Sequence, residues 1–159
     1  MNLFYLDDDM AANARSHVDR HIVKMPLEAA QLACTALSLA GASAPYKPTH
    51  KNHPCAVWCR NTRSNFEWVC AYGLALCAEY TYRYDKLHKC REVLLNCLDR
   101  KEVIPVGGLS PFALAMPDIY KCDNALLSYR RYYVGAKQHL AAWKHRPTPA
   151  WFTLSTSKT

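Results

Sequence analysis

Two imidazoles, an ammonium group and a carboxylate recur at helical spacing near the start of the chain. They are His17, His21, Lys24 and Glu28. Steps of four, three and four residues place these side chains on one face of a helix. Titratable groups that lie this close perturb one another's charge, and acid–base and electrostatic catalysis depend on such groups. We expect the last three to be catalytic and His17 to contact the substrate, although an ordinary solvated helix face with a Lys24–Glu28 pair would show the same spacing.

Basic and aromatic side chains also gather in the proline-containing loop of residues 42–53 and in the segment that follows it. The residues expected to bind substrate there are His50, Asn52, His53, Trp58 and Arg60. Cations can hold phosphates and an aromatic ring can stack on a base, so this group suits a nucleotide. The alternative is a surface loop with Trp58 in the core.

A third group of cations lies among tyrosines toward the C-terminal end. Arg130, Arg131 and Lys137 fall in a predicted helix that also carries Tyr129 and Tyr133. Arginine and tyrosine side chains on one helix can stack on bases and hold phosphates, so we expect the three cations to contact DNA. The alternative is a helix that buries its tyrosines and solvates its cations.

The eight cysteines are interpreted as reduced thiols. The first residues lack the basic region of a secretory signal, so we expect no export and no disulfide framework. Cys70 and Cys77, and likewise Cys90 and Cys97, lie two helical turns apart, which predicts that each pair is buried on an apolar stripe. One compact cluster could supply four zinc ligands: His50, His53, Cys55 and Cys59. Such clusters without a second half are usually coincidental, and we expect neither a metal nor a cofactor.

The composition indicates a globular domain with a polyanionic partner. Half of the 159 residues are hydrophobic and 21% are charged, as in folded chains. The formal charge of +7 favours nucleic acid through long-range attraction. No apolar run approaches the length of about 20 residues that a membrane span needs. We therefore expect a cytoplasmic protein with DNA as its partner and no membrane contact.

Hydrophobic periodicity predicts an all-α fold of about five to six helices in a single compact domain, residues 1–152, with a frayed tail over 153–159. The expected helices span residues 10–25, 27–40, 54–60, 64–84, 86–100 and 124–143. Expected starts are the acidic run 7–9, a capping box of Ser64 and Glu67, and Asp123. Pro26 is expected to kink the first helix or to open the second. Residues 110–117 are predicted to form one short helical turn.

The chain resembles the bacteriophage pyrimidine-dimer DNA glycosylase (endonuclease V) family in three short segments. They are Asp19-x-His21-Ile22-Val23 with Glu28 seven residues after His21, then Tyr84-Asp85-Lys86-Leu87, then residues 129–135. The segments occur in the family's order and cover a small part of the chain. The resemblance implies a phage-encoded, all-helical, single-domain enzyme that acts on DNA.

By this resemblance, Glu28 would stabilise a sugar cation or move its protons. His21 would support acid–base chemistry or contact a phosphate. The chain departs from the family at Leu27 and Gln31, where family members carry arginines that grip the DNA backbone.

The nucleophile is a further departure. In the family it is the α-amine that is exposed when the initiator Met is removed. Residue 2 here is Asn, which is generally too bulky for efficient removal, so the amine of Met1 or that of Lys24 would attack the sugar instead.

Together these features favour an enzyme that acts on a pyrimidine base, or on its glycosidic bond, in DNA. Such an enzyme extrudes a nucleotide into a pocket, which we expect between residues 17–28 and 49–63, with residues 129–146 on the DNA backbone. Two alternatives stay open: a phage transferase that modifies hydroxymethylated pyrimidines in DNA, and a non-catalytic module that binds nucleic acid or a host-defence protein.

Overall fold

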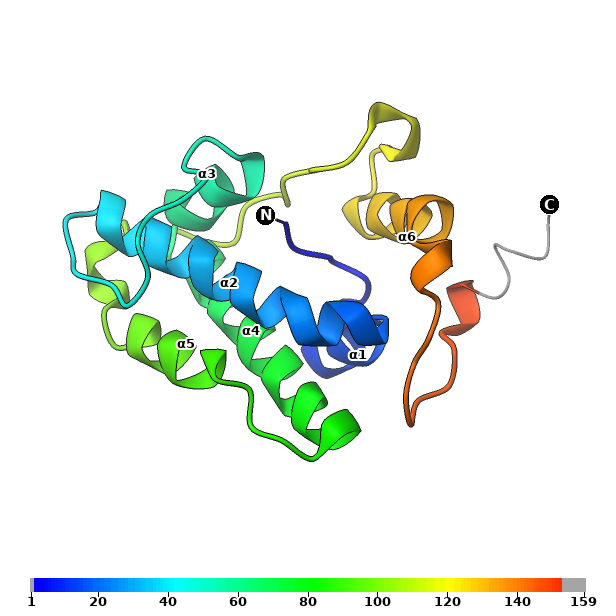
Figure 1. Ribbon diagram of the computed structural model, residues 1–159. Helices are drawn as coiled ribbons and strands as arrows, with labels where there is room; N and C mark the ends of the chain where they lie inside the picture. Colours follow the sequence, from blue (N-terminus) through cyan, green and yellow to red (C-terminus); the bar gives the residue numbers. More distant parts are fainter. Residues whose placement is uncertain (1, 153–159) are drawn as a thin grey trace.

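The computed structural model describes residues 2–152, and this part of the chain is all-helical, as the sequence predicted (Figure 1). Its α-helices are α1 (Met10–Arg15), α2 (Asp19–Leu39), α3 (Pro54–Asn61), α4 (Arg63–Tyr84), α5 (Cys90–Leu98) and α6 (Ala125–Ala136). Short 3₁₀ turns are η1 (Lys101–Val103), η2 (Asp118–Tyr120) and η3 (Gln138–Leu140). The expected tail, residues 153–159, lies outside the described residues.

Helices α2 and α4 form the centre of the domain, with α3 and α5 packed against both. The buried stripe of α2 follows the predicted periodicity: Val18, Ile22, Met25, Ala29 and Leu32 are all buried. Gly73 of α4 lies where three helices meet. A Cβ atom there would be 2.6 Å from Leu94 Cδ1 of α5 and 2.9 Å from Ala29 Cβ of α2. The absence of a side chain at Gly73 therefore allows the close approach of α2, α4 and α5.

The cysteines are part of this core. All eight are free, and the buried ones are Cys34, Cys55, Cys59, Cys70, Cys77, Cys90 and Cys97. The predicted burial of the two seven-residue pairs on α4 and α5 is confirmed. The Sγ atoms of Cys34 and Cys97 lie 3.6 Å apart, in hydrogen-bond contact between α2 and α5. These thiols act as small apolar side chains that fit between closely packed helices.

The N-terminal segment, residues 2–6, runs between the helical bundle and α6 (Figure 1). Leu3, Phe4 and Leu6 are buried, with exposed fractions of 1%, 3% and 0%. The backbone of Leu6 is held from both sides, because its N–H donates to Asn13 Oδ1 at 2.8 Å and its carbonyl accepts from Arg130 Nε at 2.9 Å. This segment therefore forms the seam that joins α6 to the bundle.

The first predicted helix, over residues 10–25, is wrong because the chain breaks at residues 16–18. Ser16 ends α1 by donating from both its backbone N–H and its hydroxyl to the carbonyl of Ala12. Val18 is extended, and α2 begins at Asp19. Pro26 does not start a new helix, because α2 continues through it.

Other predicted boundaries also shift. Thr62, not Ser64, caps α4, because its hydroxyl accepts from the N–H of Asn65 at 3.0 Å. The α5 helix starts only at Cys90, which leaves Leu87 80% exposed. Asn124, not Asp123, caps α6, which ends at Ala136. The turn predicted over 110–117 is not helical; the 3₁₀ turn η2 follows Pro117 instead.

A buried guanidinium closes the break between α1 and α2. The side chain of Arg83, near the end of α4, has an exposed fraction of 0%. It donates to the carbonyls of Arg15 at 3.0 Å and His17 at 2.8 Å. It also pairs with the carboxylates of Asp19 at 3.0 Å and Glu79 at 2.9 Å. All three nitrogens of this guanidinium thus donate hydrogen bonds, two of them to carboxylates, which makes the burial of its charge tolerable.

The Glu79 carboxylate receives a second arginine from the C-terminal segment. Arg146 binds both of its oxygens, each at 3.0 Å, and lies 3.7 Å from the centre of the Tyr82 ring. Burial raises the pKa of Glu79, but the hydrogen bonds from Arg146 and Arg83 outweigh that effect and lower it. This ion network ties the C-terminal segment to α4.

We predict that Gly73→Ala destabilises the protein by about 1–2 kcal/mol, because overpacking against Ala29 exceeds the gain in helix propensity. The measurement is the free energy of unfolding in urea. Gly108→Ala is the matched control, since a Cβ there meets nothing within 4 Å, and it should change stability little. Equal stability of the two variants would contradict the proposed three-helix contact.

Candidate functional site

The four groups first singled out do not form one continuous stripe. His17 lies in the break before α2 and is fully buried. His21 and Glu28 lie on α2 and are nearly buried, with exposed fractions of 6% and 7%. Lys24, between them, is exposed, and it forms no ion pair with any carboxylate of residues 2–152. The structure therefore brings together three of the four groups on one helix, at different depths.

His17 belongs to a hydrogen-bonded chain inside the core. The N–H of Phe4 donates to the Tyr72 hydroxyl at 3.1 Å, and this hydroxyl lies 2.8 Å from His17 Nε2. His17 Nδ1 lies 2.7 Å from the carbonyl of Asn13. Because a carbonyl only accepts, the ring proton is on Nδ1, and Nε2 accepts from Tyr72. With no exposed surface, His17 has a structural role in place of the substrate contact that we expected.

His21 is oriented by a parallel arrangement. The N–H of Val18 donates to the Tyr133 hydroxyl at 3.0 Å, and this hydroxyl lies 2.7 Å from His21 Nδ1. The buried hydroxyl proton of Tyr133 is satisfied by Nδ1, so the ring proton of His21 is on Nε2. Among the described residues, this Nε2–H has no hydrogen-bond partner. The ring also stacks on Phe4, with 4.6 Å between centroids.

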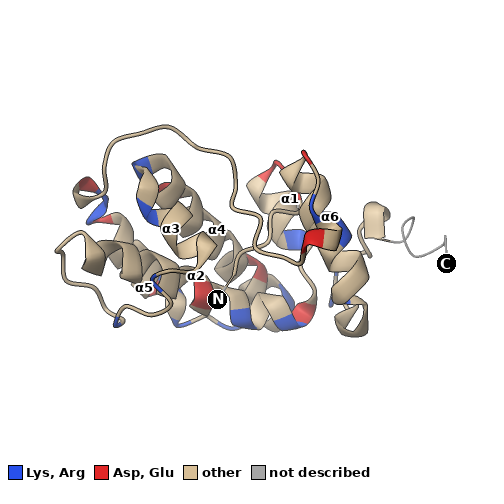
Figure 2. Ribbon diagram, turned by 90° about the horizontal axis from the view of Figure 1, so that it is seen from above, with Lys and Arg blue, Asp and Glu red and all other residues tan. Residues whose placement is uncertain are grey.

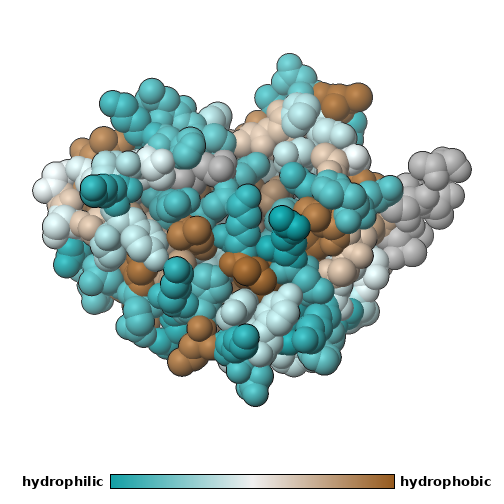
Figure 3. Space-filling view, viewed as in Figure 1, coloured by the Kyte–Doolittle hydropathy of each residue, from teal (hydrophilic) through white to brown (hydrophobic). Residues whose placement is uncertain are grey.

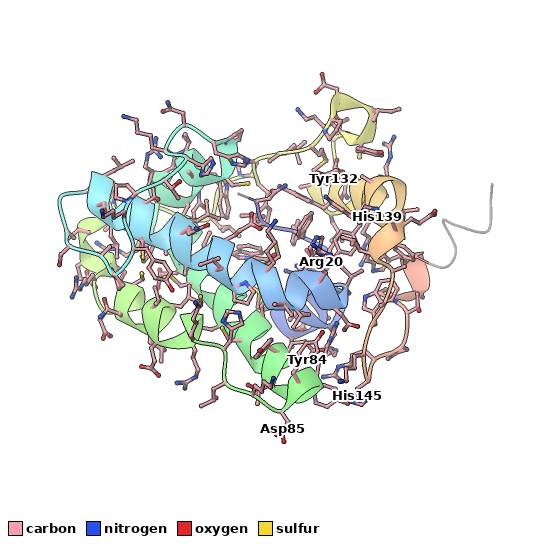
Figure 4. All side chains as sticks on the ribbon, viewed as in Figure 1. Arg20, Tyr84, Asp85, Tyr132, His139 and His145 are labelled. Atoms are coloured by element: carbon pink, nitrogen blue, oxygen red, sulfur yellow. The ribbon has the colours of Figure 1, made fainter. Side chains whose placement is uncertain are left out.

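Four basic side chains surround His21. Arg20 and Lys24 come from α2, and Lys137 and His139 come from the end of α6 and from η3. Burial, followed by the charges of these four groups, lowers the pKa of His21 to about 3. Figure 4 shows Arg20 and His139 together with Tyr132 between α2 and α6, and Figure 2 shows basic positions on both helices. We call this group the α2–α6 cationic seam.

The basic side chains of the seam have no acidic partner in the part of the chain that the structure describes. Within residues 2–152, none of the four forms an ion pair with an aspartate or glutamate. Lys137 instead lies over aromatic rings, with its Nζ 5.1 Å from the centre of the Tyr132 ring and 6.0 Å from that of Phe4. The surrounding face is mainly hydrophilic, with small separate apolar patches (Figure 3). Among the described residues, the seam is therefore a basic site without an acidic partner.

Glu28 lies two helical turns farther along α2, toward α3. Burial lowers the pKa of His53, and the Glu28 carboxylate opposes that shift. Burial raises the pKa of Tyr72, and Glu28 adds to the rise. Asn2 lies in the same region, where its Oδ1 is 3.4 Å from Cys55 Sγ. Glu28 and His53 thus act on each other electrostatically, although His53 is also the cap of α3, with its Nδ1 accepting from the N–H of Cys55.

The other residues predicted around α3 divide between surface and core. His50 and Asn52 are exposed, and the Arg60 guanidinium donates to the Lys51 carbonyl. Trp58 is in the core, stacked on Phe112 at 4.9 Å, as the alternative interpretation held. In the described part of the chain, no three His, Cys, Asp or Glu side chains are grouped so as to hold a metal ion, so the zinc cluster is not assembled.

The two arginines predicted to contact DNA from α6, Arg130 and Arg131, form contacts with other segments of the chain. Arg130 holds Leu6, pairs with Asp7 at 3.6 Å and lies over the Trp151 ring. Arg131 donates to the carbonyl of Ile119 at 3.0 Å. Of the predicted α6 cations, Lys137 is the one that joins the seam.

Sequence reasoning missed three members of the seam: Arg20, Tyr132 and His139. Arg20 could have been predicted, because it is a basic residue next to His21 in the chain. His139 could not have been found, because the predicted helix continued through residue 143, whereas α6 ends earlier and the chain turns back over α2.

Comparison of the chain with protein-family models, with curated proteins and with solved structures gives no match. Within residues 2–152, no helix has both the length and the apolar character to cross a membrane. The basis for a function is therefore the chemistry of the α2–α6 cationic seam and of Glu28.

We predict that stability falls as the pH drops from 6.5 to 5. Burial lowers the pKa of both His17 and His21 to about 3. Between pH 6.5 and 5 these imidazoles therefore take up protons in the unfolded chain but not in the folded protein, which favours unfolding. Each histidine should lower the free energy of unfolding by about 1–2 kcal/mol between pH 6.5 and 5. Above pH 6.5 it should have little effect. The stabilisation from the lowered pKa of Glu79 is fully present above its ordinary pKa of 4.5 and is lost only as the pH falls below that value, outside this window.

The measurement is urea unfolding at pH 7, 6.5, 6, 5.5 and 5. His17→Gln should flatten the dependence on pH, even if it lowers stability at pH 7. An unchanged slope in this variant would show that His17 is not the group that resists protonation.

Proposed function

We propose that this protein is a DNA-acting enzyme that cleaves the glycosidic bond of a pyrimidine nucleotide, with Glu28 as the catalytic carboxylate. The observation that supports it is the placement of a nearly buried carboxylate on the same helix as the cationic seam. One part of α2 can thus hold the DNA backbone while another acts on a sugar two turns away, about 10 Å along the helix. The resemblance to pyrimidine-dimer glycosylases supports the same residue.

In this mechanism the C1′–N1 bond breaks and its electron pair leaves with the base. The sugar becomes cationic, and a carboxylate that is shielded from water stabilises that charge strongly. Water, or a protein amine, then bonds to C1′, and Glu28 takes the proton that is released. His21, as a neutral donor, would contact a phosphate next to the reacting sugar.

The nucleophile can be Met1 or Lys24 only if an amine attacks. Met1 lies outside the described residues. Lys24 is exposed, so burial does not activate its amine. Hydrolysis by water is therefore the form of the reaction that we favour.

We predict that Glu28→Gln lowers turnover by a factor of about 100 or more, because the amide keeps the size of the side chain but cannot take a proton. Turnover would be measured on duplexes that contain either a pyrimidine dimer or a hydroxymethylated pyrimidine, beside a melting curve. Glu92→Gln is the matched control, since that side chain is 79% exposed on α5. It should leave turnover unchanged.

Undiminished turnover by Glu28→Gln would refute the catalytic assignment. DNA binding without turnover in the wild type would favour the non-catalytic module instead. A product in which a group has been added to the base, with the base still attached, would favour the transferase.

We also predict that DNA binding weakens steeply as salt rises, because lysine and arginine contacts release condensed counterions. Titration of a labelled duplex at several salt concentrations measures the slope of log affinity against log salt. Binding that is insensitive to salt, or absent at low salt, would contradict a nucleic-acid partner.

A further inference from the structure

An uncharged donor sits unused at the bottom of the α2–α6 cationic seam. The Tyr133 hydroxyl donates to His21 Nδ1, so the ring proton is on Nε2. This Nε2–H has no partner among the described residues. The side chain is only 6% exposed, but Nε2 is not one of the fully buried polar atoms without a partner, so it keeps contact with solvent and an acceptor from solution can reach it. The atom is held rigidly, because Phe4 stacks on the ring and the Tyr133 hydroxyl is itself fixed by Val18.

The basic groups near this donor come from two segments. Arg20 and Lys24 lie on α2, and Lys137 and His139 follow the end of α6. The nearest acidic side chain in sequence, Asp19, is already engaged by Arg83 and by the N–H of Lys144. An anion in the seam would reduce the repulsion between these basic groups. It would also accept a hydrogen bond from the Nε2–H of His21.

We propose that the α2–α6 cationic seam binds a phosphate group, with the Nε2–H of His21 as a neutral donor at its base and Arg20 and Lys137 as its charged contacts. Tetrahedral phosphate oxygens can accept from an arginine fork, an ammonium and an imidazole together. This site deepens the phosphate contact of the proposed function, on which it rests, but it needs neither Glu28 nor a cleavage reaction.

Phosphate of two origins shares this chemistry: a free phosphate or nucleoside monophosphate, and the phosphodiester of a nucleic-acid strand. The probes are therefore inorganic phosphate, thymidine monophosphate and a thymidine hexanucleotide. Binding would be measured by isothermal titration calorimetry. In parallel, ¹H–¹⁵N spectra of the imidazoles would follow His21 Nε2 directly.

Two isosteric variants separate the donor from the packing. His21→Asn keeps an acceptor for the Tyr133 hydroxyl but has no group at the ε position, and we expect it to lose roughly tenfold in affinity. His21→Gln can present an amide N–H near that position and should retain most of the affinity. Lys137→Met and Arg20→Met should each lose roughly tenfold as well. Lys47→Met, at an exposed position in the loop after α2, makes the same change in net charge and should lose less than twofold.

The expected result is a shift of the His21 Nε2–H resonance on adding phosphate and the ranking of variants just given. Tighter binding of the hexanucleotide would identify a strand as the source, and tighter binding of the small anions would identify a free phosphate. Equal affinity of His21→Asn and wild type, or losses in Lys47→Met equal to those in Lys137→Met, would overturn the site. Phosphate binding is measured without turnover, so failure of the proposed reaction is distinguishable from failure of this site.

Discussion

The buried guanidinium of Arg83 is the interaction on which the N-terminal half of the structure depends. It pairs with Glu79 and Asp19 and also donates to the backbone carbonyls of Arg15 and His17, where α1 ends. Loss of one partner from a buried ion pair typically costs about 3–5 kcal/mol, because the other charge is left without compensation. Several helix ends meet at this single side chain, so it sets how α2 enters the core.

The point at which α2 begins determines the hydrogen bonds and the tautomers of His17 and His21. The chain break at residues 16–18 points the N–H of Val18 at Tyr133, which then donates to His21. The same break turns His17 into the core, where Tyr72 and the backbone satisfy both of its nitrogens. Two neighbouring imidazoles thus have opposite tautomers. His17 is fully buried, whereas the nearly buried His21 keeps an Nε2–H donor that has no partner among the described residues.

The α2–α6 cationic seam illustrates how fold and binding can compete. Cations without acidic partners repel one another and favour neither packing nor stability. They are held together because the N-terminal segment and α6 are anchored by apolar burial and by the hydrogen bonds of Leu6, not by the charges themselves. A site of this kind is stabilised when an anion arrives, which links binding to the stability of the seam.

The sequence by itself determined the all-helical class, the apolar stripe of α2 and the burial of the paired cysteines. It also determined that His21 and Glu28 lie on one helix. Those properties are local, because helical periodicity sets which side chains share a face. Only the tertiary structure decided that α1 and α2 are separate, that His17 is buried, and that Arg20, Lys137 and His139 converge on His21. These outcomes depend on contacts between distant segments, such as that of Tyr72 with His17, 55 residues apart, and that of Tyr133 with Val18, 115 residues apart. No local spacing encodes such a contact, since it arises only when α6 folds back over the N-terminal segment and α2.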